Sequence, residues 1–251
     1  MPTALILFFF FLPFQFALSP LPGVDLAVAR VAAIILGICW MGRSLARRSL
    51  WIPWGFKAPL LITFFALSLL SLLWADMPEW GIRKFLFLVS FLPLFFVAAE
   101  SFRRASTFFS FNRALVYGAS ITGAIGILQF SLQAIFSLDA ILNFWTHQIL
   151  PLFLGQTFAQ AVAQYPSLLV NIGGHTLLRA TGFFPDPHMF SFFMGMTLPL
   201  ALGLALTQHH HKERFFILAG LIFIADCLTF SRGGYFGLIV GHVEDSLTSC
   251  R

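Results

Sequence analysis

The feature that most constrains this chain is a series of long, nearly uncharged apolar blocks separated by short polar connections. A helix of about 20 apolar residues crosses the hydrocarbon core of a bilayer, where no water is present to bind free backbone groups. Seven blocks approach this length, at residues 4–18, 24–41, 58–74, 85–99, 114–136, 189–206 and 215–230, and a shorter run follows at 233–241. The pattern predicts an all-α fold, a polytopic transmembrane helical bundle of seven to eight spans.

Composition excludes a water-soluble globular domain. Of the 251 residues, 59% are hydrophobic and 10% are charged, whereas about 25% of residues are charged in ordinary soluble domains. The apolar residues exceed what one folded core of this size hides from water, so most of the chain must be solvated by lipid. The lipid bilayer is therefore the first predicted partner.

The formal net charge of +5 does not indicate nucleic-acid binding, because the basic residues stand singly or in pairs between the apolar blocks. Their distribution instead predicts topology, since cytoplasmic connections retain Lys and Arg. The richer connections hold Arg43, Arg47, Arg48, Lys57, Arg103, Arg104, Arg113, Lys212 and Arg214, and the poorer ones hold Arg83, Lys84, Arg179 and Arg232. This asymmetry predicts a cytoplasmic N-terminus and an outer-face position for the long loop 137–188.

No metal or cofactor is predicted from the cysteines. Cys39 and Cys227 lie inside apolar blocks and Cys250 is next to the last residue, so the chain has neither a disulfide framework nor a paired-cysteine metal site.

A first cluster of polar residues precedes the block at 189–206. It joins Arg179, a turn at Gly182 and a Pro-Asp-Pro sequence ending at Pro187. The start of a helix offers free N–H groups and a partial positive charge, so this junction suits an anionic ligand. The alternative is structural: Asp186 and Pro187 start the helix, and Arg179 extends toward lipid head groups.

A second cluster at 228–235 places Arg232 between two apolar blocks, on the same predicted face as Arg179. Two arginines brought together there could hold a phosphate or pyrophosphate, because the planar guanidinium forms paired hydrogen bonds with such groups. The alternative is that Arg232 anchors the chain at the interface beside a glycine-rich helix contact.

Together, the two clusters resemble the O-antigen ligase and O-antigen polymerase family of bacterial membrane glycosyltransferases. The matching residues are Arg179, Gly182, Asp186 and Pro187 in the first cluster and Ser231, Arg232 and Gly233 in the second. The order of the clusters, the helix pair between them and the preceding spans match as well, so the resemblance covers residues 1–241.

The resemblance implies a metal-independent glycosyltransferase of lipopolysaccharide and cell-envelope biosynthesis, in the bacterial inner membrane with loop 137–188 in the periplasm. Such an enzyme takes a glycan from undecaprenyl pyrophosphate and passes it to the lipid A core, to another glycan or to a protein. By the same resemblance Arg179 and Arg232 bind the donor pyrophosphate, where they neutralise charge on the leaving group.

Two departures from the family pattern affect the catalytic residues. His188 stands where the family commonly has Asn, and it is the nearest candidate for a base, although a histidine in a loop is more often an ordinary polar contact. The family also has a later periplasmic loop with a functional histidine, which no residue here matches. We therefore expect a truncated chain that is inactive alone, with an incomplete ligase-like region at 1–241 and an atypical tail at 242–251.

Two other functions fit the same sequence. A transporter or flippase of polyprenyl-linked glycans or lipids would use a basic outer-face cavity without breaking a bond, and a non-functional membrane remnant would insert and do nothing further. Discontinuous spans in two corresponding halves would favour a transporter, and the sequence shows no such symmetry.

Overall fold

The computed structural model describes residues 2–21, 24–48, 57–164, 166–208 and 211–235. It divides the chain into two compact units. The first contains Met1–Leu5 and Ala29–Phe108, and the second contains Ile6–Val28 and Phe109–Arg251. The predictions for 242–251, and for most of the run at 233–241, lie outside the described residues.

The first unit is built from three main helices: α2 (Val28–Ala46), α3 (Lys57–Ser71) with its 3-10 extension η2 (Leu72–Trp74), and α4 (Pro78–Ser101). Pro78 stands in the first turn of α4, where its missing N–H costs nothing. Helix α4 packs on α2 at Gly37, where the Cβ of an added side chain would lie 2.3 Å from the Cβ of Pro93 in α4. The two helices therefore approach closely at a glycine.

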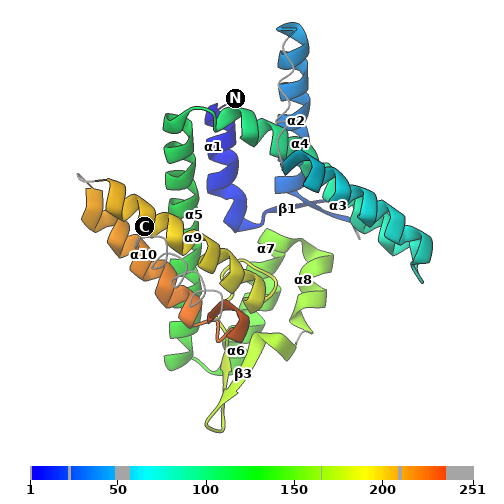
Figure 1. Cartoon of the computed structure of the whole chain (residues 1–251). Helices are drawn as coiled ribbons and strands as arrows, with labels where there is room; N and C mark the ends of the chain where they lie inside the picture. Colours follow the sequence, from blue (N-terminus) through cyan, green and yellow to red (C-terminus); the bar gives the residue numbers. More distant parts are fainter. Residues whose placement is uncertain (1, 22–23, 49–56, 165, 209–210, 236–251) are drawn as a thin grey trace. The chain divides into compact units, whose positions relative to one another are not determined.

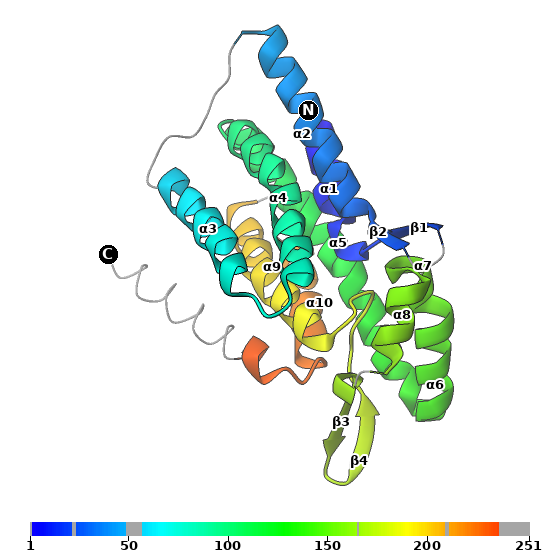
Figure 2. The same cartoon turned by 90° about the vertical axis from the view of Figure 1, so that its right-hand side faces the viewer.

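The second unit holds the helices around the candidate site. They are most of α1 (Pro2–Phe11) with η1 (Leu12–Phe14), α5 (Ala105–Ser131) with η3 (Leu132–Ala134), α9 (Pro187–Thr207) and α10 (Lys212–Cys227). Helices α9 and α10 lie side by side (Figure 1 and Figure 2). Buried side chains of α5, α9 and α10 form one hydrophobic core, which includes Val116, Phe190, Met194, Phe215 and Ile222.

The connection between α5 and α9 is more ordered than the sequence predicted. It forms α6 (Leu138–Phe144), the π-helical turn η4 (Trp145–Ile149), α7 (Leu150–Leu154), α8 (Gln156–Ala163), η5 (Pro166–Leu168) and the strands β3 (Leu169–Ile172) and β4 (His175–Leu178). The strands pair antiparallel, from Leu169 opposite Leu178 to Ile172 opposite His175. Gly173 and Gly174 make the turn with φ of 59° and 88°. A small hydrophobic core, which includes Ile141, Trp145, Leu150 and Val162, holds the helices of this connection together.

The predicted all-α class is confirmed for the bulk of the described residues. Two short hairpins are the exceptions, β3–β4 and the pair β1 (Ala17–Leu21) and β2 (Val24–Ala27). The second hairpin occupies the end of the predicted span 4–18 and the start of 24–41. The helical segment ends before this hairpin because Pro13 interrupts it shortly after α1 and Gln15 adopts a left-handed conformation with φ of 55°.

Among the described residues, four helices are long and apolar enough to cross a membrane: Val28–Ala46, Pro78–Ser101, Ala105–Ala134 and Pro187–Thr207. Helices α1 and α3 are apolar but shorter, and α10 has 16 residues. Along the 24 residues of α4, Val97 alone is buried within the described structure, while Leu86 and Phe87 are exposed. An apolar surface of this kind is costly in water and favourable in lipid, so the four helices indicate a membrane protein.

Candidate functional site

The two polar clusters singled out in the sequence meet in the second unit. The backbone N–H of Ala180 donates to the carbonyl of Leu228 at 3.1 Å. From the side chain of Arg179, Nε donates to the carbonyl of Thr229 at 2.6 Å and Nη2 donates to that of Phe230 at 3.3 Å. Residues about fifty positions apart in the chain are therefore joined at one place.

Arg179 is the centre of this junction, with 6% of its surface exposed. Its Nη1 donates to the carbonyl of Ser167 at 3.0 Å and lies 3.5 Å from Nε2 of His188. Because one guanidinium contacts the segment before β3, the start of α9 and the segment after α10, it links three parts of the unit. Most of its N–H groups are engaged by the protein itself.

The electrostatics of Arg179 combine two opposing effects. Burial lowers the pKa of Arg179 from its ordinary value, and the nearby Asp186 carboxylate raises it. Arginine starts from so high a pKa that the side chain stays charged. A fixed positive charge therefore stands at the meeting point of the two clusters.

Asp186 caps the start of α9. Its Oδ1 accepts from the backbone N–H of His188 at 2.6 Å, and its Oδ2 accepts from Oγ of Ser167 at 3.0 Å. Pro187 occupies the first helical position, where no N–H is needed. The structural interpretation of these two residues as a helix start is therefore confirmed, and both carboxylate oxygens are in use.

His188 connects the clusters a second time. Its Nδ1 lies 2.9 Å from Oγ of Ser231, and its Nε2 faces the guanidinium of Arg179. Because arginine can only donate, any hydrogen bond from Arg179 is accepted by Nε2 of His188, and Nδ1 is the ring nitrogen that pairs with the Ser231 hydroxyl. His188 is exposed, but both of its ring nitrogens have protein neighbours.

Gly182 is required by its backbone conformation and its surroundings. It has a φ of 55°, and an added Cβ would lie 3.0 Å from Cγ2 and 3.1 Å from the carbonyl oxygen of Thr122. Trp145 Nε1 donates to the carbonyl of Gly182 at 3.1 Å. The turn after Arg179 is thus packed tightly against α5 and η4.

Gln129 of α5 and Gln133 of η3 hold this turn, and sequence reasoning missed both. Oε1 of Gln129 accepts from the backbone N–H groups of Thr181 at 2.9 Å and Gly182 at 3.1 Å. Gln133 forms a pair of hydrogen bonds with the backbone of Leu178, at 2.7 and 2.8 Å. The signal was present in the sequence, since two glutamines four residues apart interrupt the apolar block 114–136 on one helix face.

The second cluster exposes its arginine. Thr229 and Ser231 are fully buried, while Arg232 and Gly233 are exposed. Phe230 between them has a φ of 50°, which turns the chain sharply after α10. Within the described ranges Arg232 has no ion pair and no side-chain hydrogen bond, so its charge is open to the surroundings.

Below the junction, Asp226 of α10 accepts a short hydrogen bond from Oγ of Ser191 in α9. The other carboxylate oxygen, Oδ2, is buried and has no partner among the described residues. Gly234 packs directly on this pair, because an added Cβ would lie 1.7 Å from Oγ of Ser191. A buried carboxylate with an oxygen that lacks a partner is expensive in a protein interior, so the packing of Ser191, Asp226 and Gly234 is a distinctive feature of this part of the site.

No group of three or more His, Cys, Asp or Glu side chains is arranged to hold a metal ion in the part of the chain that the structure describes. The comparisons with protein-family models, with curated proteins and with solved structures find no match for this chain. The functional argument therefore depends on the junction itself.

Proposed function

We propose that this chain is a membrane glycosyltransferase-type protein, similar to O-antigen ligases and polymerases, that binds polyprenyl pyrophosphate-linked glycan at the junction around Arg179. The observation that carries the proposal is the meeting of two distant clusters on one buried guanidinium. In this proposal the site faces the periplasm from the bacterial inner membrane, within a bundle of seven to eight spans.

The two arginines have different roles in this proposal. Arg179 is buried and occupied by backbone carbonyls, so it positions the two segments and contributes a fixed charge. Arg232 is exposed and follows Ser231, which contacts His188 beside that charge. An approaching pyrophosphate would thus meet Arg232 directly, with the charge of Arg179 behind it, in surroundings where fixed cations are effective.

The reaction proposed breaks the bond between the anomeric carbon of the glycan and an oxygen of the pyrophosphate. An acceptor hydroxyl oxygen forms the new bond to that carbon and loses its proton to a base, and polyprenyl pyrophosphate leaves with its bonding electrons. Negative charge grows on the leaving group, so the positively charged guanidinium of Arg232 stabilises the transition state more than the ground state. The acceptor is the lipid A core, another glycan or a protein side chain.

Donor binding is tested by measuring the Kd of the purified full chain in detergent for farnesyl pyrophosphate, a short prenyl pyrophosphate. Arg232→Ala should weaken binding by about tenfold or more, the effect of losing one charge-assisted hydrogen bond. Arg232→Lys should recover part of the loss. Arg214→Ala is the matched control, because Arg214 is an exposed arginine at the opposite end of α10. Equal Kd values for the Arg232→Ala and Arg214→Ala variants would contradict the proposal.

Transfer is separated from transport by a second assay. In cells with labelled lipid-linked glycan, an active transferase produces glycan joined to an acceptor, and Arg232→Ala lowers the amount of that product. A chain that is inactive alone, as expected from its sequence, binds the donor but forms no product. A transporter instead moves the lipid-linked glycan across the membrane without forming the product. Movement without product, again dependent on Arg232, would replace the transferase proposal with the transporter function.

A further inference from the structure

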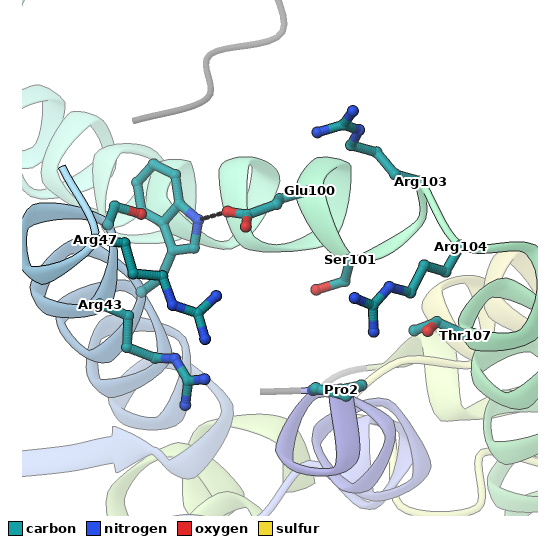
Figure 3. A pocket seen from close by; sticks show the side chains of 10 residues that line it. Pro2, Arg43, Arg47, Glu100, Ser101, Arg103, Arg104 and Thr107 are labelled. Atoms are coloured by element: carbon teal, nitrogen blue, oxygen red, sulfur yellow. Dashed lines mark hydrogen bonds between the residues drawn. The ribbon is translucent and has the colours of Figure 1, made fainter. Parts of the chain in front are cut away.

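A polar hollow of about 540 Å³ lies within the first unit, and it shares no residue with the donor site proposed above. Four arginines line it, Arg43, Arg47, Arg103 and Arg104, together with Trp40 and Glu100. Arg43 and Arg47 extend from the end of α2, and Arg104 extends from the turn after α4 (Figure 3). The hollow therefore gathers positive charge from two separate segments of the chain.

Glu100 is engaged by an aromatic side chain of the hollow. Its carboxylate accepts a short hydrogen bond from the indole Nε1 of Trp40, as Figure 3 shows. Within the described part of the first unit, no ion pair joins Glu100 to Arg43, Arg47 or Arg104. The hollow thus retains a strong positive balance and suits a negatively charged group.

An apolar groove of about 630 Å³ adjoins the hollow, and Trp40 lines both of them. The groove runs along α2 from Ile34 to Leu45 and along α4 from Leu92 to Phe96. Gly42 leaves space in it, since an added Cβ there would meet nothing within 4 Å. A polar cationic hollow joined to an apolar groove matches a ligand with an anionic head and a hydrocarbon tail.

The dimensions and position of the groove agree with a lipid. From Ile34 to Leu45 an α-helix rises about 16 Å, which is close to the hydrocarbon depth of about 15 Å in one leaflet. Arg47 and Ser101 stand at the ends of α2 and α4, two of the helices long enough to span a membrane. The hollow therefore belongs at head-group level, on the face that the charge pattern predicts to be cytoplasmic.

We propose that this hollow and groove bind one anionic phospholipid, with the phosphate among Arg43, Arg47 and Arg104 and one acyl chain between α2 and α4. This differs from general attraction of basic residues to a membrane surface, which needs neither a hollow nor a groove. It is also independent of the donor site, because its residues belong to the first unit.

The test measures lipid binding by native mass spectrometry of the full chain released from detergent. The probes are phosphatidylglycerol, phosphatidylcholine with the same acyl chains, and glycerol 3-phosphate, which carries an anionic phosphate without acyl chains. Phosphatidylglycerol should bind about tenfold or more tightly than phosphatidylcholine. Glycerol 3-phosphate should bind more weakly still, since it cannot fill the groove. Equal binding of the two lipids would overturn the proposal.

Two pairs of variants test the two parts of the site. Arg43→Ala/Arg47→Ala should remove the preference for phosphatidylglycerol, and the version with Lys at both positions should keep most of it. The control Arg83→Ala/Lys84→Ala removes the same charge from exposed positions that do not line the hollow. An equal loss in this control would indicate general surface attraction and overturn the site.

Gly42→Leu should fill the groove and weaken binding of phosphatidylglycerol without changing charge. Its control is Gly203→Leu, because Gly203 is also a helical glycine with nothing within 4 Å of an added Cβ. If Gly42→Leu has no effect and glycerol 3-phosphate binds as tightly as the lipid, the hollow is a site for a free anion and the lipid proposal is wrong.

Discussion

At the scale of single residues, the candidate site depends on a few polar side chains that satisfy buried backbone groups. Gln129 accepts from two consecutive N–H groups of the turn after Arg179. In a protein interior an unsatisfied donor costs about 1–3 kcal/mol, so these contacts decide whether the turn keeps its shape. The glutamine itself stands out within an apolar block, but its partner could not be predicted from local patterns, because Gln129 and Thr181 are 52 residues apart.

Gln129→Leu should lower the free energy of unfolding in detergent by roughly 2–5 kcal/mol, because it leaves the N–H groups of Thr181 and Gly182 without an acceptor. Denaturant-induced unfolding followed by circular dichroism measures the change. Gln160→Leu is the control, since Gln160 is exposed on α8. A Gln129→Leu chain as stable as this control would show that the turn does not need the glutamine.

Gly182→Ala should destabilise more than Gly173→Ala. Both glycines have a positive φ, 55° and 59°, but an added Cβ meets Thr122 at Gly182 and nothing within 4 Å at Gly173. The left-handed conformation costs both variants about 1–2 kcal/mol, and contact with the α5 backbone adds to the cost at position 182. Equal changes in the unfolding midpoint of the two variants would show that Thr122 moves aside at little cost in stability.

At the scale of elements, the long apolar blocks predicted helices well and their boundaries less well. The block at 24–41 corresponds to α2 at Val28–Ala46, and the block at 189–206 corresponds to α9 at Pro187–Thr207, whose start was marked by Asp186 and Pro187. The short helices α6 to α8 were missed because their burial depends on one another, as Leu150 and Val162 in their shared core illustrate. A pattern confined to one short helix carries too little of that information.

The contact between α9 and the helical residues 232–235, which follow the turn after α10, supplies a prediction at this scale. Gly234→Ala should push residues 232–235 away from Ser191 and break the hydrogen bond from Ser191 to Asp226, with a loss of stability of about 1–3 kcal/mol. Gly233→Ala should change stability little, since its added Cβ would meet Phe192 at an ordinary 3.6 Å.

A double-mutant cycle checks the physical cause of that loss. Adding Ser191→Ala to Gly234→Ala removes the clashing oxygen, so the combined loss should be smaller than the sum of the two single losses. Strict additivity in the measured free energies of unfolding would mean that Gly234 does not act through Ser191.

At the scale of the whole molecule, composition predicted a membrane protein, and four apolar helices support that class. The finer prediction of seven to eight spans depends on the shorter helices as well.

If α10 crosses the membrane, its two ends face opposite sides. In a chain freed of native cysteines, single cysteines replacing Arg214 and Arg232 should then differ in labelling by an impermeant maleimide from the outer face, with Arg232→Cys the accessible one. Labelling of both from one side would contradict the predicted topology.

The central proposal concerns where a prenyl pyrophosphate binds, and photocrosslinking tests it most directly. A photoreactive polyprenyl pyrophosphate is bound to the full chain in membranes, irradiated, and its attachment sites are located by mass spectrometry. The account predicts attachment within 179–188 and 228–235, the two segments joined by Arg179. Attachment confined to other segments, such as the arginine-lined hollow of the first unit, would contradict it.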